Sequence, residues 1–364
     1  MRKLHILAAA AAMTASSLFA DVQIGKGLSL SGYLDMTYQN AASSGNNGTK
    51  NDAAGFNVAT AEIDIAMDFG GGLTAQIDLE GNVQSDNSAA PNTGDIAVEQ
   101  ARIDYAMGQG TLTLGKFDTF IGLEGLEAPD LYQFSNSLTF ALEPTQHEGL
   151  AYAFDNGQFN FAAAIVNSLG SNNGNGNGDS EELSYAVHLG FTPSEALSLN
   201  LNYGTEANSA PTSVAGIAGI AAGDVFDSTL LTADLSYSNH GWTVGAEYVV
   251  LDEDRANAAG AVAATGTDTT AMMLMVNYMI SEQFGLTARY STAETDVAAG
   301  AKPEATEISL AASYAVTPNW SALIEFRSEE FKNGYTNGQV ADYTGLTGTK
   351  QDADVITLET ILTF

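Results

Sequence analysis

The sequence contains no cysteine, few basic residues and no long apolar run after its N-terminus. Its 364 residues include 12 Lys and Arg against 44 Asp and Glu, which gives a formal net charge of −32. The lack of cysteine excludes disulfides, cysteine-ligated metal sites and thiol nucleophiles. The shortage of basic residues argues against nucleic-acid partners, because such binding depends on Lys and Arg that neutralise phosphates. The lack of an apolar run of about 18 residues argues against a transmembrane helix.

The first twenty residues have the pattern of a secretory signal peptide. Two basic residues, Arg2 and Lys3, precede a short apolar stretch, and Ala20 is the small residue expected before a cleavage site. We therefore expect residues 1–20 to be removed on export. Residues 21–364 are then expected to form a single domain outside the cytoplasm.

Apolar and polar residues alternate along the rest of the chain. The apolar residues Ile63, Ile65, Met67 and Phe69, for example, interleave with the polar residues Glu62, Asp64 and Asp68. Successive side chains of a β-strand point to opposite faces, so each alternating segment has one apolar face and one polar face. The segments have about the length that a tilted membrane strand needs.

The connections between the segments fall into two classes. Short turns, marked mostly by Gly, Asn or Pro, are predicted at 70–72, 108–110, 155–157, 193–195, 239–241, 281–283 and 317–319. Long polar loops are predicted near 40–55, 84–94, 118–148, 168–180, 207–224, 252–268, 293–304 and 328–352. These fifteen connections separate sixteen strands, with a range of 14 to 18.

This pattern predicts an all-β protein, a transmembrane antiparallel up-and-down β-barrel with short periplasmic turns and long external loops. A closed barrel pairs every backbone polar group internally, as lipid requires. Aromatic residues near the short turns would form a ring at one water–lipid boundary. They are Phe69, Tyr105, Phe154, Phe159, Phe191, Tyr237, Trp242, Tyr278, Phe284 and Trp320. A secreted β-sandwich or propeller would alternate as well, but it gives no reason for such a ring.

The segment from Leu114 to Leu150 carries a family resemblance. Its features are Gly115-Lys116-Phe117, Ile121-Gly122 with Glu124, Ala128-Pro129-Asp130, Tyr132 with Ser135 and Ser137, and Pro144 with His147 and Gly149. In these features it resembles the OmpL-like β-barrel porins of Gram-negative outer membranes, although Phe120 stands where a Pro is expected. The resemblance implies an outer-membrane channel for passive diffusion of small hydrophilic solutes and ions. It also implies that the terminal Phe364 is read by the barrel-assembly machinery.

The longest loop, residues 118–148, is expected to fold into the lumen and narrow it. Loops of this length usually have a function, and this one has enough apolar residues to pack. The resemblance implies the same, because the third loop of sixteen-stranded porins does so; an external flap is the alternative. The candidate residues of the constriction are Lys116, Asp118, Glu124, Glu127, Asp130, Glu143, His147 and Glu148.

The predicted inward face is mainly acidic. Its acidic candidates are Asp35, Glu62, Asp64, Asp68, Asp78, Glu80, Asp104, Asp234, Glu247, Glu307, Glu325 and Glu359, and its basic ones are Arg102, Arg289 and Arg327. A pore lined by one sign of charge concentrates counter-ions, so we expect a preference for cations. An adaptation to a saline habitat is the alternative, and it would leave selectivity weak. The arginines lie either opposite acids across the constriction or in ion pairs with neighbours.

Enzymatic activity is not expected. The histidines after the signal peptide are His147, His188 and His240, and no nucleophile signature accompanies them. The acidic run Asp252-Glu253-Asp254 lacks the Gly and downstream Glu of an EF-hand loop, so we expect a solvated loop there. The sequence thus predicts no cofactor and no specific metal site.

The expected partners are outer-membrane lipids and lipopolysaccharide, with divalent cations as one possible bridge through the acidic loops. Trimers are common among sixteen-stranded porins, so a homotrimer is one expected state. Two other functions stay open. The first is a substrate-selective channel. The second is a surface interaction protein whose long loops bind a partner, with the barrel serving only to hold the loops in the membrane. The apolar run Val214 to Ala222 is expected to form a short helix or a subunit contact.

Overall fold

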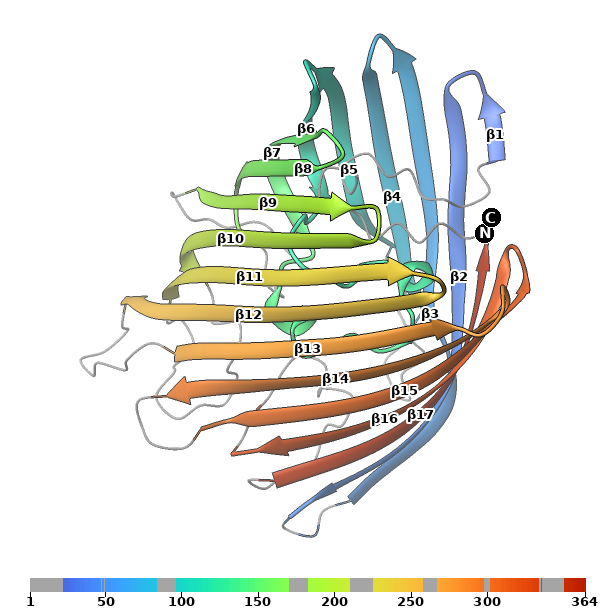
Figure 1. The fold of residues 1–364 in the computed structure, drawn as a ribbon, viewed down its shortest axis with the longest axis vertical. Helices are drawn as coiled ribbons and strands as arrows, with labels where there is room; N and C mark the ends of the chain where they lie inside the picture. Colours follow the sequence, from blue (N-terminus) through green and yellow to red (C-terminus); the bar gives the residue numbers. More distant parts are fainter. Residues whose placement is uncertain are drawn as a thin grey trace.

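Sixteen antiparallel strands, β2 to β17, form one closed sheet in the computed structural model (Figure 1). Each strand pairs with the next in sequence, and β17 pairs with β2 to close the barrel. A short strand, β1 (Val22–Gly25), pairs with the start of β2. The up-and-down barrel predicted from the alternation is therefore confirmed.

The structure describes residues 22–46, 48, 50–83, 96–169, 183–209, 225–257, 267–297, 302–333, 335 and 350–364. The expected signal peptide and the run Val214 to Ala222 lie outside these residues. Within the described part of the chain, no helix is long and apolar enough to cross a membrane.

The barrel strands are β2 (Leu28–Gly45), β3 (Lys50–Gly70), β4 (Leu73–Val83), β5 (Ile96–Met107), β6 (Gly110–Asp118), β7 (Gln146–Asp155), β8 (Phe159–Val166), β9 (Ser184–Ser194), β10 (Leu197–Ser209), β11 (Val225–Asn239), β12 (Trp242–Asn257), β13 (Thr267–Met279), β14 (Phe284–Val297), β15 (Glu304–Thr317), β16 (Trp320–Lys332) and β17 (Lys350–Thr363). Two short 3₁₀ helices, η1 (Ala128–Asp130) and η2 (Phe140–Leu142), lie between β6 and β7.

The two faces of the strands differ as the alternation predicts. On β14, Leu286 and Tyr290 are exposed on the outside, whereas Arg289 and Ser291 are buried on the inside. Outward-facing apolar side chains of this kind suit a lipid environment. Seven of the ten predicted boundary aromatics are exposed, and Trp242 and Tyr278 pack with ring centroids 4.3 Å apart beside their turns.

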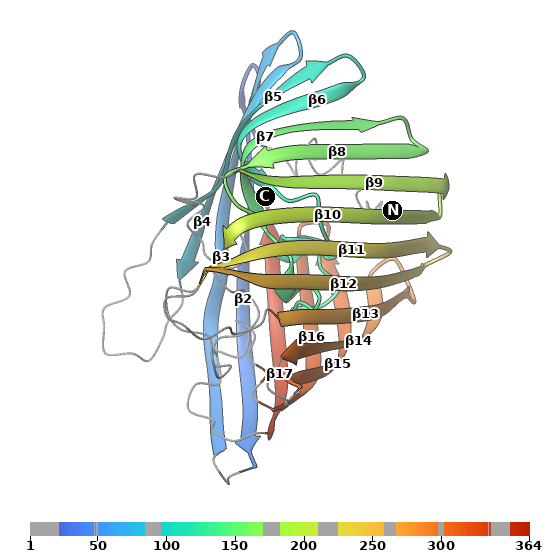
Figure 2. The same cartoon turned by 90° about the vertical axis from the view of Figure 1, so that its left-hand side faces the viewer.

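All seven short turns form where they are predicted. Several long loops are shorter than predicted, because the strands continue beyond the apolar band. β2 and β3 remain paired up to Ser44 and Lys50, so most of the predicted loop 40–55 is a protruding hairpin (Figures 1 and 2). The acidic run Asp252-Glu253-Asp254 likewise lies on β12 and not in a loop. Above the lipid both faces meet water, so the alternation fades while backbone pairing persists.

The seam between β2 and β17 ends at the last residue of the chain. Gly32 and Phe364 exchange backbone hydrogen bonds of 3.1 and 3.0 Å. A Cβ atom at Gly32 would clash with the carbonyl oxygen of Glu62 and with the ring of Phe364. Glycine at this position therefore lets the terminal ring lie against the wall.

Candidate functional site

The segment between β6 and β7, residues 119–145, packs against the inner side of the barrel (Figures 1 and 2). The Tyr132 hydroxyl donates to Thr243 on β12 at 3.3 Å. The backbone N–H and the hydroxyl of Ser135 donate to the Glu325 carboxylate on β16 at 3.0 and 2.6 Å. The segment is thus bonded to strands that are far from it in sequence. It is called the inner segment below.

Arg289 on β14 is the main ionic anchor of the inner segment. Its guanidinium is fully buried and lies 2.6 Å from Glu124 of the segment and 2.6 Å from Glu307 on β15. It also donates to the backbone carbonyls of Ser135 and Asn136 at 2.6 and 2.8 Å. A buried charge needs such partners, because removing it from water is costly.

A second polar anchor follows a few residues later in the inner segment, at Thr139 and Glu143. The Thr139 hydroxyl donates to Glu247 on β12 at 2.7 Å. Burial raises the pKa of Glu143 well above its ordinary value, and the negative charge of Glu247 raises it further. The protonated form of Glu143 is therefore favoured where the segment meets the wall.

The apolar residues of the inner segment belong to one buried cluster that includes a patch of small wall side chains. We call this patch the alanine floor. It consists of Ala151 and Ala153 on β7, Ala162 and Ala164 on β8, and Ala186 on β9. Phe120, Ile121, Leu138 and Leu142 of the segment belong to the same buried cluster. The small floor leaves room for these larger side chains, so this part of the lumen face is apolar where a polar one was predicted.

His147 on β7 is part of this packing. Its ring is buried, with centroids 5.9 Å from Phe117 and 6.0 Å from Phe120. Its Nε2 atom lies 2.9 Å from the Thr119 hydroxyl. The ring of His188 on β9 also lies near Phe120, with centroids 6.4 Å apart. Both rings thus pack against an aromatic side chain instead of facing an open cavity.

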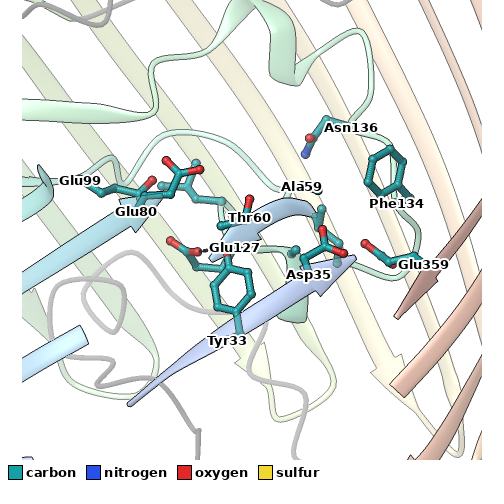
Figure 3. Close-up of a pocket in the computed structure, with 13 residues that line it drawn as sticks. Tyr33, Asp35, Ala59, Thr60, Glu80, Glu99, Glu127, Phe134, Asn136 and Glu359 are labelled. Atoms are coloured by element: carbon teal, nitrogen blue, oxygen red, sulfur yellow. Dashed lines mark hydrogen bonds between the residues drawn. The ribbon is translucent and has the colours of Figure 1, made fainter. Parts of the chain in front are cut away.

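The carboxylates around Glu127 border a cavity of about 240 Å³ (Figure 3). In the figure, Glu80 and Glu99 lie on one side of Glu127, and Asp35 and Glu359 lie on the other. Further lining residues include Tyr33, Ala59, Thr60, Leu126, Leu131, Phe134 and Asn136. The Tyr33 hydroxyl donates to Glu127 at 2.8 Å. The cavity is therefore a strongly acidic space between the inner segment and the wall.

Most of the predicted wall residues point into the barrel. Ten of the twelve acidic candidates are buried; Glu80 is half-buried at the cavity, and Asp68 is exposed beside the turn at Gly70. Arg102 and Arg327 lie 3.7 Å from Asp104 and Glu329, each on its own strand. The arginines are therefore paired with near neighbours, and Arg289 additionally reaches the inner segment.

The predicted constriction residues are divided between the two faces. Glu124, Glu127, Asp130 and Glu143 belong to the inner segment, with Asp130 exposed, and Asp118 ends β6 and accepts from Gln146 at 3.3 Å. Lys116 and Glu148 lie directly opposite each other on β6 and β7. They share the outer face with the exposed Leu114 and Leu150. Lys116 and Glu148 therefore do not belong to the candidate constriction.

Several buried or half-buried acids were missed by the sequence reasoning, among them Glu99, Glu253 and Glu329. Glu253 and Glu329 face inward on β12 and β16. The prediction placed both residues in loops, and longer predicted strands would have put them on the inward face. On β5 the even-numbered residues Gln100, Arg102 and Asp104 face inward, so the odd-numbered Glu99 would be expected to face outward. The pairing passes from Asp78↔Gln100 to Leu79↔Val98, so Glu99 is the extra residue of a β-bulge. The bulge turns its side chain toward the cavity.

A family model described as "Putative beta-barrel porin-2, OmpL-like" matches residues 27–364. The chain belongs to this family. As an OmpL-like porin it lies in the outer membrane and forms a channel there. No curated protein matches the sequence.

Solved porin structures share the fold at low sequence identity. The outer-membrane channel DcaP of Acinetobacter baumannii aligns with a TM-score of 0.67 and 11% identity, covering 95% of this chain and 100% of that one. An anion-selective porin from Comamonas acidovorans aligns at 0.65 and 14%, covering 93% and 99%. OmpT of Vibrio cholerae, in its trimer form, aligns at 0.60 and 14%, covering 93% and 99%. At these identities the comparison concerns the fold alone.

Proposed function

We propose that this porin passes small hydrophilic solutes and ions by passive diffusion and prefers cations. The observation that carries the preference is the sign of the inward charge. Among described strand residues with buried side chains, twelve are Asp or Glu and two are Arg. The acids are Asp35, Glu62, Asp64, Asp78, Asp104, Asp234, Glu247, Glu253, Glu307, Glu325, Glu329 and Glu359. An acidic lumen attracts cations and repels anions.

The inner segment is proposed to be the constriction. Support comes from its bonds to β12, β14 and β16 and from its apolar packing on β7–β9. A sixteen-stranded barrel otherwise encloses a wide aqueous space. A segment bonded to several sides of the wall would reduce that space and set the size limit for solutes.

No enzymatic activity is proposed for the lumen. Within the described ranges, Thr119 and His147 form a hydroxyl–imidazole hydrogen bond of the kind that a nucleophile and a base make. Thr119 and His147 are both buried, and the histidine ring packs beside two phenylalanines. A substrate could not reach this pair without displacing the inner segment.

The decisive experiment is the reversal potential of the purified porin in a planar bilayer under a tenfold KCl gradient. The reversal potential is expected to have the sign of the K⁺ equilibrium potential, because K⁺ should pass more easily than Cl⁻. A potential set by Cl⁻ would refute the preference, and a complete lack of conductance would instead favour the surface interaction function. Liposome swelling with sugars of increasing size tests the general pore, because a substrate-selective channel would depart from a smooth decline with size.

Assembly is part of the proposal. Phe364, whose backbone pairs with Gly32, is proposed as the signal for the barrel-assembly machinery. A Phe364→Ala variant should then reach the outer membrane in smaller amounts at equal synthesis. A homotrimer in lipid and lipopolysaccharide is also proposed, by analogy with the trimer form of OmpT. Conductance that closes in three equal steps would support it, and single steps would contradict it.

A further inference from the structure

Three carboxylates from separate parts of the chain meet beside the acidic cavity. Glu62 lies on β3, Glu99 on β5, and Glu127 in the inner segment directly before η1. One oxygen from each lies within 4.8 Å of the other two. Across the described ranges, no ion pair joins any of the three to a Lys or Arg.

A second observation concerns the hydrogen bonds of the cluster. Glu62 is 4% exposed, and its Oε2 atom has no hydrogen-bond partner. Glu99 accepts from Gln146 at 3.0 Å through Oε1, but its Oε2 atom also lacks a partner. A buried carboxylate oxygen without a donor is costly. The two oxygens therefore have free coordinating capacity where protein donors are missing.

We propose that Glu62, Glu99 and Glu127 bind a calcium ion. Oxygen-only ligand sets suit hard divalent cations. Two ligands of one ion cannot be farther apart than twice the metal–oxygen distance. That limit is about 4.6–5.2 Å for Ca²⁺ and about 4.2 Å for Mg²⁺. The three oxygens lie within 4.8 Å of one another, which is inside the range for Ca²⁺. Mg²⁺ is the poorer match because it demands near-ideal octahedral geometry and loses its water ligands reluctantly.

The surroundings suit such a site. The adjoining cavity of about 240 Å³ has room for the water ligands that Ca²⁺ needs beyond three carboxylates. Two β-bulges border it, at Glu99 on β5 and around Ala59 and Thr60 on β3. Bulges are common beside functional sites because they redirect a side chain. Here the bulge on β5 supplies one of the three ligands.

The ion joins the wall to the inner segment, because Glu62 and Glu99 come from strands and Glu127 does not. Any effect of calcium on conductance rests on the proposed channel function, but binding does not. The test below therefore measures binding alone. A failed binding test leaves the channel proposal untouched, and a failed conductance test leaves the site untouched.

The experiment is calorimetric titration of the purified full-length porin in detergent with CaCl₂ at neutral pH. One site is expected, with weaker binding of MgCl₂. Glu62→Gln, Glu99→Gln and Glu127→Gln should each weaken Ca²⁺ binding by at least about 10-fold. The control is Asp254→Asn, an exposed acid on β12, which should leave the affinity unchanged.

Terbium luminescence provides a readout that needs no change to the ligands. The Tyr33 phenol contacts Glu127, so it would lie close enough to sensitise Tb³⁺ in the site. Tyr33→Phe should reduce the emission that CaCl₂ displaces. The proposal is overturned if the wild type binds no Ca²⁺, which would indicate a shared proton in the cluster. It is equally overturned if the three Gln variants bind like the control, or if Tyr33→Phe leaves the emission unchanged.

Discussion

Replacement of Arg289 should release the inner segment from the wall. Arg289→Gln removes a fully buried cation and leaves Glu124 and Glu307 without their ionic partner. Breaking a buried ion pair by removing one partner costs about 3–5 kcal/mol. Since about 1.4 kcal/mol changes an equilibrium tenfold, the undocked population of the segment should rise by a factor of about 100 to 5000.

Limited proteolysis with chymotrypsin measures this population. The enzyme has sites at Phe134 and Phe140 in the segment, and cleavage follows the open fraction when opening is fast. Lys302→Gln is the charge-matched control, because that exposed ammonium pairs with Glu294 and Asp296 at the surface, where ion pairs contribute little to stability. If Arg289→Gln and Lys302→Gln are cleaved at the same rate, Arg289 is not the anchor described above.

Three further predictions concern charge, pH and the seam. Asp35→Asn combined with Glu359→Gln removes two cavity carboxylates and should shift the reversal potential toward zero; an unchanged potential would place selectivity elsewhere. The pKa of Glu143 is raised in the docked segment, so the docked segment keeps this proton to higher pH than the undocked segment, and docking should weaken as pH rises above the ordinary range of a Glu carboxyl; chymotrypsin cleavage that slows relative to the Lys302→Gln control as pH rises would contradict this. Gly32→Ala should lower the yield of heat-resistant barrel, since a Cβ there clashes with Glu62 and Phe364; a normal yield would show that the seam can adjust.

The fold could be predicted from the sequence because two simple physical requirements act on every strand. Lipid demands apolar side chains outside, water demands polar ones inside, and both act with period two. The turn at Gly70–Gly72 and its six counterparts follow from local backbone needs. The β2–β3 hairpin was underestimated because its outer part, around Ala42 and Asp52, lacks the alternation of apolar and polar residues that marks the rest of the two strands.

The site was less predictable because it depends on contacts between distant segments. Glu99 reaches the cavity through a bulge, and one inserted residue reverses the parity on which the prediction relied. Lys116 was selected from the motif and Glu148 as an acid of the predicted loop 118–148, and neither was selected from the face of its strand. The partners of Arg289 depend on the path of a segment that begins far away in sequence. The alternation alone carries no information on such a path.

The alanine floor has a consequence for how this barrel could be re-engineered or could diverge. Ala162 and Ala164 share a buried cluster with Phe120 and Ile121 of the inner segment, so extra methylenes at these two positions should crowd that cluster and push the segment away from β8. The penalty for such crowding is about 1–3 kcal/mol per site. Substitutions at Ala162 and Ala164 could then change the width of the channel in small steps while every charged side chain of the lumen stays as it is.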